Sequence, residues 1–185
     1  MQIEIKIDAS QVVNGLGKLM DAMKDTRPIR RAIGELLLES TRERIRAQGP
    51  DPDGNSWQPL SPTYLLTKKG RGMLRESNSL IETLCWQLTD DGVVVGSNKP
   101  YAAIHQLGGV IRKKASTKTI RLRKVGNQTR FAKKSHKKAR EMTVKVGEHT
   151  IHIPARPYLG VSEADKSEII LVTKEILEMA LNGQI

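Results

Sequence analysis

The stretch that decides the fold is Pro28–Gln48, PIRRAIGELLLESTRERIRAQ, the longest helical pattern in the chain. Its apolar residues recur at helical spacing and mark one face for burial: Ile29, Ile33, Leu36 and Leu37. The opposite face is charged: Arg31, Glu35, Glu39, Arg42 and Glu43. Pro28 suits the first turn of a helix, where its missing N–H leaves no hydrogen bond unmade. The pattern therefore predicts one long amphipathic helix that ends near Gln48.

The residues before this helix predict a strand followed by a further helix. Gln2–Ile7 alternates strictly between polar residues and isoleucine, which is typical of a half-buried strand. Asp8 or Ser10 can cap the next helix. The apolar stripe of that helix has the spacing of helical turns: Val12, Leu16, Leu19, Met20 and Met23.

The residues after the long helix predict a loop, a short helix and a hairpin. Gly49–Pro62 is dense in Pro, Gly, Asp and Asn, and Ser61 can cap a short helix that ends near Lys69. The run Leu84–Thr89 alternates, and an Asp-Asp-Gly turn leads from it into Val93–Val95, which predicts a hairpin. Tyr101–Leu107 is helical in pattern and is stopped by two glycines.

The C-terminal part predicts a second hairpin and a final helix. Met142–Val146 alternates and is followed by Ile151 and Ile153 across a turn centred on Gly147. Ser162 begins the last helix, with Asp165 three residues on in the manner of a capping box. We therefore predict an α+β fold, in which an antiparallel sheet is packed by the long helix of the N-terminal half and by a C-terminal helix.

The positive charge of the chain is concentrated in one segment. The formal net charge is +11. Residues 112–140 hold thirteen Lys or Arg and no Asp or Glu: Arg112, Lys113, Lys114, Lys118, Arg121, Arg123, Lys124, Arg130, Lys133, Lys134, Lys137, Lys138 and Arg140. The rest of the chain then holds 18 basic and 20 acidic residues. Such a run repels itself, so we predict one α+β domain of residues 1–111 and 141–185 with a long basic loop, 112–140, inserted.

The composition also narrows the class of protein. No apolar run approaches the roughly 18 residues of a membrane helix, and Met1–Lys6 lacks the apolar core of a secretory signal. The single cysteine, Cys85, excludes an intrachain disulfide framework and lies in a strand pattern typical of a buried thiol. These features predict folding in a cytoplasm, without a membrane partner.

The sequence predicts no catalytic residues, no metal site and no cofactor. Asp51–Pro62 superficially resembles a calcium loop, but its glycine stands at the wrong position and Pro62 occupies the place of the final glutamate. His149 and His152 are three apart in a strand-like setting, which puts them on opposite faces. No nucleophile elbow, phosphate-binding loop or dinucleotide fingerprint is present.

Four segments in order resemble the phage virion morphogenesis family, the tail completion family of Mu-like phages. They span roughly residues 30 to 180, and any one alone would be weak: Pro52–Tyr64 with Lys68–Gly70, Met73–Ser77, Val95–Ser97 with Tyr101–Gly109, and Ile153–Ser162. The resemblance implies a structural protein of the neck or tail that completes the tail or joins it to the head. It does not imply an enzyme. It further implies a homo-oligomeric ring, with a hexamer as the size that tail symmetry favours.

Several expectations follow from the resemblance. The partners would be further copies of the chain, tail tube or terminator proteins and connector proteins, within a virion assembled in the bacterial host cytoplasm. The candidate subunit contacts are Trp57, Tyr64, Arg156 and Tyr158. For Trp57 the alternative is a loop anchored to its own core, and for Arg156 it is an intrachain ion pair.

The basic segment supports an alternative function, non-specific binding of nucleic acid. Its thirteen cations could neutralise phosphates of the phage genome, with an affinity that falls as salt rises. The segment has only one aromatic residue, Phe131, whereas single-strand binders stack bases on several. A cationic wall would also slow DNA that must slide through a channel, so an acidic protein surface is the preferred partner of residues 112–140.

Overall fold

The computed structural model describes residues 10–184, which form two compact units. We name residues 10–107 and 155–184 the core unit, and Gly108–Pro154 the ribbon unit. Helices and antiparallel sheets occur together, which confirms the α+β class. Unlike the single sheet predicted, the strands form three small sheets. The strand predicted at Gln2–Ile7 lies outside the described residues.

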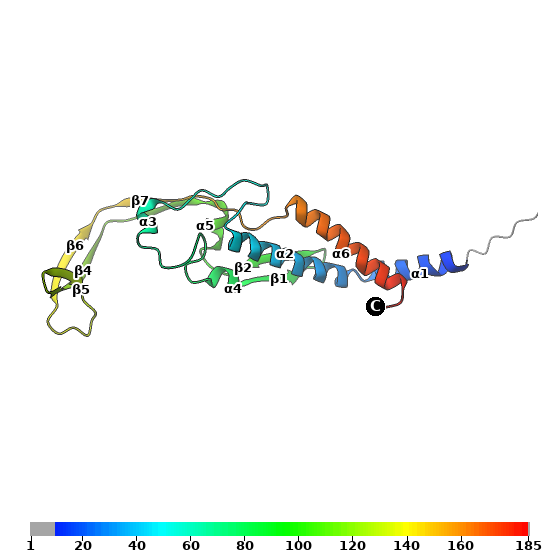
Figure 1. Ribbon diagram of the computed structural model, residues 1–185, viewed down its shortest axis with the longest axis horizontal. Helices are drawn as coiled ribbons and strands as arrows, with labels where there is room; N and C mark the ends of the chain where they lie inside the picture. The colour runs from blue at the N-terminus through cyan, green and yellow to red at the C-terminus, as the bar shows by residue number, and fades with distance from the viewer. Residues whose placement is uncertain (1–9, 185) are drawn as a thin grey trace, which may run out of the picture. The chain divides into compact units, whose positions relative to one another are not determined.

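The core unit holds most of the helices and one hairpin. In chain order its elements are α1 (Ser10–Lys24), α2 (Arg27–Ala47), α3 (Pro62–Leu65), α4 (Ser79–Glu82), β1 (Leu84–Leu88), β2 (Val93–Ser97), α5 (Ala102–Leu107) and α6 (Glu163–Leu181), as labelled in Figure 1. The long helix, the β1–β2 hairpin, α5 and the capping box of α6 confirm their predictions. The helix after Ser61 is shorter than predicted, because it ends at Leu65.

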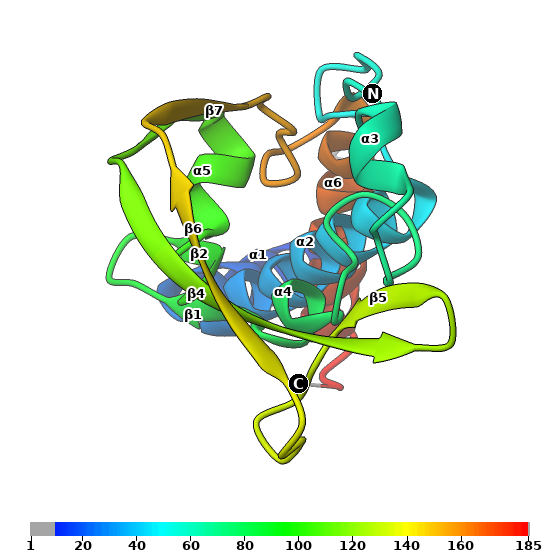
Figure 2. The same ribbon diagram turned by 90° about the vertical axis from the view of Figure 1, so that its left-hand side faces the viewer.

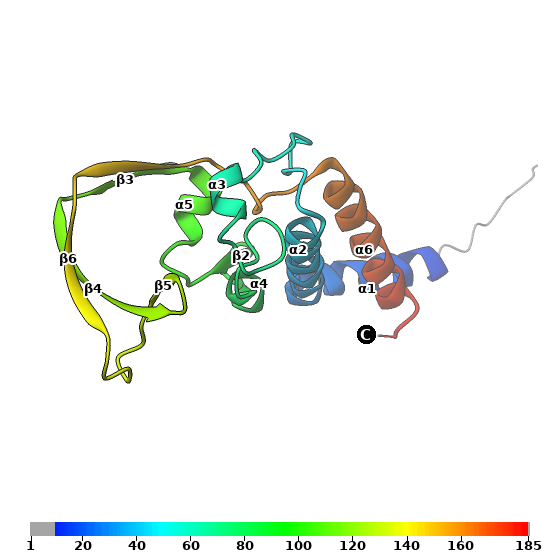
Figure 3. The ribbon, with the colours of Figure 1, turned by 60° about the vertical axis from the view of Figure 1, so that its left-hand side comes forward.

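The core lies where α2 meets the hairpin and the loops around it. Its buried side chains come from six different elements and loops: Ile45, Trp57, Leu80, Leu84, Ala102 and Tyr158. Figure 3 shows α6 beside α2, and the two helices are in contact. Segments that are far apart in sequence therefore depend on one another for burial.

One face of helix α1 packs against α6, and the other face is exposed. Lys18 Nζ donates to the carbonyl of Leu181 at 2.9 Å. Leu16, Met20 and Met23, which belong to the predicted apolar stripe, are 55%, 65% and 65% exposed. The prediction of one buried stripe is thus wrong for these three, because α6 packs against a different side of the helix. An apolar surface of this kind is available to a further protein.

At Gly34, α2 packs tightly against the hairpin, and the replacement of this residue is our first prediction. A Cβ at this position would lie 2.8 Å from Trp86 Cδ2 and 2.9 Å from Val93 Cγ2. Gly34→Ala should therefore lower the free energy of unfolding by about 1–3 kcal/mol, measured by urea denaturation. The control is Gly17→Ala on α1, where nothing lies within 4 Å and alanine should stabilise the helix by up to about 1 kcal/mol. If both substitutions changed the free energy of unfolding equally, the close packing of Gly34 against the hairpin would be contradicted.

The ribbon unit is built from five strands. They are β3 (Gly109–Lys113), β4 (Ser116–Val125), β5 (Gln128–Phe131), β6 (Arg140–Val146) and β7 (His149–Ile153). β3 pairs with β7, and β4 pairs with both β5 and β6, all antiparallel. Figure 2 shows β4 and β6 side by side, with β5 turned back along β4.

One register runs through both pairings of the ribbon. Gly109 faces Ile153, Lys113 faces His149, and Ser116 then faces Val146. The interruption at residues 114–115 and 147–148 thus removes the same number of residues from each side. The second hairpin predicted around Gly147 is wrong, because β6 and β7 pair with β4 and β3 instead of with each other.

The basic segment is not the irregular loop that was predicted. β4, β5 and the start of β6 lie within residues 112–140. Strand pairing satisfies the backbone while most of the cationic side chains stay exposed, so charge density did not prevent regular structure. The unit also starts before residue 112 and ends after residue 140.

Candidate functional site

The segment Ala155–Gly160 is bound by side chains from several parts of the core unit. Arg156 donates from Nε and Nη2 to the carbonyl of Gln58 at 3.0 and 2.8 Å. The indole N–H of Trp57 donates to the carbonyl of Pro157 at 3.0 Å. These contacts fasten the loop Gly49–Pro62 to the segment, so the two motifs singled out in the sequence lie together.

Gln106 clamps the same segment from α5. Its Oε1 accepts from the N–H groups of Tyr158 and Leu159 at 2.9 and 3.0 Å, and its Nε2 donates to the carbonyl of Leu159 at 2.9 Å. The N–H of Arg156 donates to the carbonyl of His105 at 2.8 Å. Burial, with a contribution from the charge of Arg156, lowers the pKa of His105. α5 therefore acts as a structural support for the extended segment.

Three of the four candidate subunit contacts have internal roles. Trp57, Arg156 and Tyr158 are buried, and they contact their own core unit. Each of them is at most 6% exposed, and their role at a subunit interface stays a prediction. For Arg156 the ion-pair alternative is wrong, because its partners are backbone carbonyls. Tyr64 is 46% exposed, and it remains a candidate contact.

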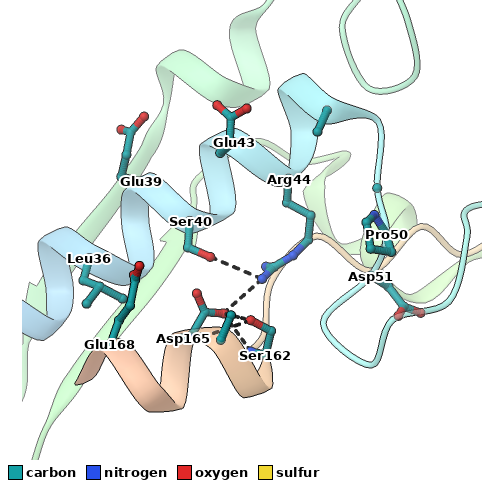
Figure 4. Close-up of a pocket in the computed structure, with 13 residues that line it drawn as sticks. Leu36, Glu39, Ser40, Glu43, Arg44, Pro50, Asp51, Ser162, Asp165 and Glu168 are labelled. Atoms are coloured by element: carbon teal, nitrogen blue, oxygen red, sulfur yellow. Dashed lines mark hydrogen bonds and ion pairs between the residues drawn. The ribbon is translucent and has the colours of Figure 1, made fainter. Parts of the chain in front are cut away.

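A buried ion pair joins α2 to the start of α6. Arg44 Nη2 lies 3.1 Å from Asp165 Oδ2, and both side chains are almost fully buried. Arg44 also donates to the carbonyl of Tyr158 at 2.8 Å. Figure 4 shows the guanidinium between Ser40 and the carboxylate, which in turn accepts from Ser162.

The pKa of Asp165 reflects opposing effects. Burial favours the neutral acid, but hydrogen bonding with Ser40 and Ser162 and the charge of Arg44 outweigh it and hold the pKa below its ordinary value. The carboxylate is therefore the stable form at neutral pH. Sequence reasoning found the cap but missed Arg44. The signal in the sequence was the position of Arg44, eleven residues after Ile33. Eleven residues make about three helical turns, so Arg44 lies on the apolar stripe of α2 although it is charged.

A groove of about 560 Å³ lies beside this ion pair, between α2 and α6 (Figure 4). We name it the α2–α6 groove. Apolar groups from both helices and the following loop line it: Leu36, Ala47, Pro50 and Ala164. Five carboxylates and a single guanidinium, that of Arg44, also line it: Glu39, Glu43, Asp51, Asp165 and Glu168. The groove therefore combines an apolar surface with a net negative charge.

The thirteen candidate cations lie on the ribbon unit and do not converge on one point. All except Arg121 and Arg123 are exposed. Arg121 forms an ion pair with Glu141 at 3.2 Å and donates to the carbonyl of Lys134 at 2.7 Å. It thus holds the loop between β5 and β6 against β4. Among the described ion pairs, no other member of the thirteen has an acidic partner.

The residues that carry metal or redox chemistry elsewhere are scattered here. Within residues 10–184 no group of three His, Cys, Asp or Glu side chains could hold a metal ion. The carboxylate of Asp51 accepts from the N–H groups of Asp53 and Asn55, which confirms a turn at this point. Cys85 is exposed, so the prediction of a buried thiol is wrong: its strand belongs to a two-stranded hairpin with one open face. No helix in the described part of the chain is long and apolar enough to cross a membrane.

The relatives and the family model that match this chain agree with each other. Protein G of Escherichia phage Mu, named as a candidate capsid assembly protein, is 24% identical over 98% of this chain and 97% of its own. The Mu-like prophage FluMu G protein 2 of Haemophilus influenzae is 26% identical over 91% of each chain. No solved structure matches significantly. Residues 7–178 match the phage virion morphogenesis family. The chain therefore belongs to this family, which is one of phage assembly proteins and not of enzymes.

Proposed function

We propose that the protein is a structural subunit of the phage neck or tail, which completes the tail or joins it to the head by assembling into a ring. Family membership over residues 7–178 is the observation that carries the proposal. The protein acts by binding, in a virion assembled in the bacterial cytoplasm. Its partners are further copies of itself, with a hexamer as the favoured ring, and the tail tube, terminator and connector proteins.

The distribution of polar and apolar groups supports an assembly role. The buried polar side chains Arg44, Arg156 and Asp165 bind backbone groups or each other, so they support the fold instead of aiming at a substrate. Large apolar side chains remain exposed on α1 and on α6, including Ile170 and Leu171. Apolar residues grouped on a helix surface are typical of protein contacts.

A second candidate function, non-specific binding of duplex DNA, is favoured by one observation. The cations of residues 112–140 are mostly exposed and mostly lack acidic partners among the described residues. DNA phosphates could pair with these cations in place of acidic side chains, and the affinity for DNA would then fall steeply as the salt concentration rises. Phe131, the aromatic residue of the segment, is 78% exposed on β5, which gives one stacking surface and not a platform for several bases.

The test is size-exclusion chromatography with light scattering on the purified chain at low and physiological salt, with and without a duplex of about 30 base pairs. The proposal expects a discrete closed oligomer at physiological salt whose mass does not change with DNA. A strict monomer across a wide concentration range, with a salt-sensitive shift onto DNA, would replace the ring by the nucleic-acid function.

A further inference from the structure

The ribbon unit has one face that its own strands leave uncovered. Residues directly opposite each other in antiparallel strands share a face. The pairing therefore puts these apolar side chains on one face of the β5–β4–β6 sheet, which we name the apolar face: Ile120, Leu122, Phe131, Met142, Val144 and Val146. Phe131 and Met142 are 78% and 42% exposed. A ribbon of two or three strands is only marginally stable unless such a face is covered.

The same face carries positive charge and no acid. Lys118 and Lys124 flank the apolar residues of β4 on this face, and Arg140 on β6 lies opposite Leu122. Glu141, the acidic residue of β6, lies on the other face, opposite Arg121. A partner for the apolar face must therefore offer apolar groups together with carboxylates.

The α2–α6 groove has this combination. Leu36 and Ala164 contribute apolar surface from its two helices, and Glu43 and Glu168 are exposed carboxylates at its lining. Glu168 has no partner among the described ion pairs. The groove, at about 560 Å³, can take several side chains of a strand.

We propose that the apolar face of the ribbon unit of one copy docks in the α2–α6 groove of a neighbouring copy. The inference rests on the proposed ring and names the contact that builds it. Because the two surfaces differ, the contact is head-to-tail, and such contacts close into rings when the rotation between copies permits. DNA is the weaker occupant of this face, because phosphates would pair with the cations but leave the apolar residues uncovered.

A set of single charge reversals tests the contact. Lys118→Glu alters the apolar face, and Glu168→Lys alters the groove. Lys145→Glu is the matched control: Lys145 is exposed, carries the same charge, and faces Thr117, the neighbour of Lys118, on the opposite side of the ribbon. Circular dichroism and thermal unfolding establish that each variant folds. The midpoint concentration of assembly is then measured by light scattering.

Lys118→Glu and Glu168→Lys should each raise the midpoint concentration for assembly at least about tenfold, while Lys145→Glu changes it little. The double variant should assemble at least as well as the more impaired of the two single variants. The reason is that the effects of substitutions at residues that meet across one contact are not additive. If the effects of the two substitutions on the midpoint concentration were fully additive, or if neither changed it, the docking contact would be overturned. The ring proposal would still stand. A wild-type chain that never assembles would overturn the ring itself.

Discussion

Tyr158→Ala should lower the free energy of unfolding by about 3–5 kcal/mol, a large part of the roughly 5–15 kcal/mol that stabilises an ordinary domain. Tyr158 is 0% exposed, and its hydroxyl donates to the carbonyl of Ala102 at 3.3 Å. Its ring lies among Ile45, Trp57 and Leu80 in one cluster, so truncation would leave a cavity shared by several elements. Urea denaturation followed by tryptophan fluorescence measures the loss.

Two further tyrosine variants separate the causes. Tyr158→Phe keeps the ring and removes one hydrogen bond, so it should cost only about 1 kcal/mol. Tyr64→Ala makes the same truncation at an exposed ring and should change stability by less than about 0.5 kcal/mol. If Tyr64→Ala proved as harmful as Tyr158→Ala, the assignment of the core would be wrong.

Arg44→Met should cost about 3–5 kcal/mol, because it leaves the carboxylate of Asp165 buried without its partner. It also removes the donor to the carbonyl of Tyr158. The matched control is Arg46→Met, two residues along α2, whose ion pairs with Glu39 and Glu43 are exposed to solvent. The control should change stability by less than about 1 kcal/mol.

The same ion pair predicts how stability depends on pH. The pKa of Asp165 lies below its ordinary value in the folded chain, so the unfolded chain binds the proton more readily. The contribution of the pair is present above about pH 4, the ordinary pKa of aspartate, and is lost as the pH falls through the folded value. In Asp165→Asn this part of the acid dependence should be missing. Stability curves of the wild-type and Asp165→Asn chains that stay parallel as the pH falls below about 4 would contradict it.

Local sequence signals were sufficient for the long helices and the hairpin of the core unit. The spacing of Ile29, Ile33 and Leu36 indicated α2, and Ser162 with Asp165 indicated the start of α6. These signals depend on residues within a few positions of each other. The clamp formed by Gln106 could not be predicted in this way, because its partners Tyr158 and Leu159 are more than fifty residues away.

The ribbon unit was mispredicted for a different reason. Charge density suggested a solvated loop, but Ile120 and Leu122 alternate with Arg121 and Arg123, which is the period of a strand with one apolar face. The hairpin expected around Gly147 failed because alternation identifies strands but does not select their partners. Pairing was decided by the long-range register between Gly109 and Ile153, which no local pattern contains.

The unbroken register has a consequence for how relatives can diverge. The backbone N–H of Arg156 donates to the carbonyl of His105, which holds the two segments that lead into and out of the ribbon unit next to each other in the core unit. Adding or removing two residues in each paired strand keeps every side chain on its face. The length of the ribbon can therefore change in steps of about 7 Å without moving any side chain to the other face.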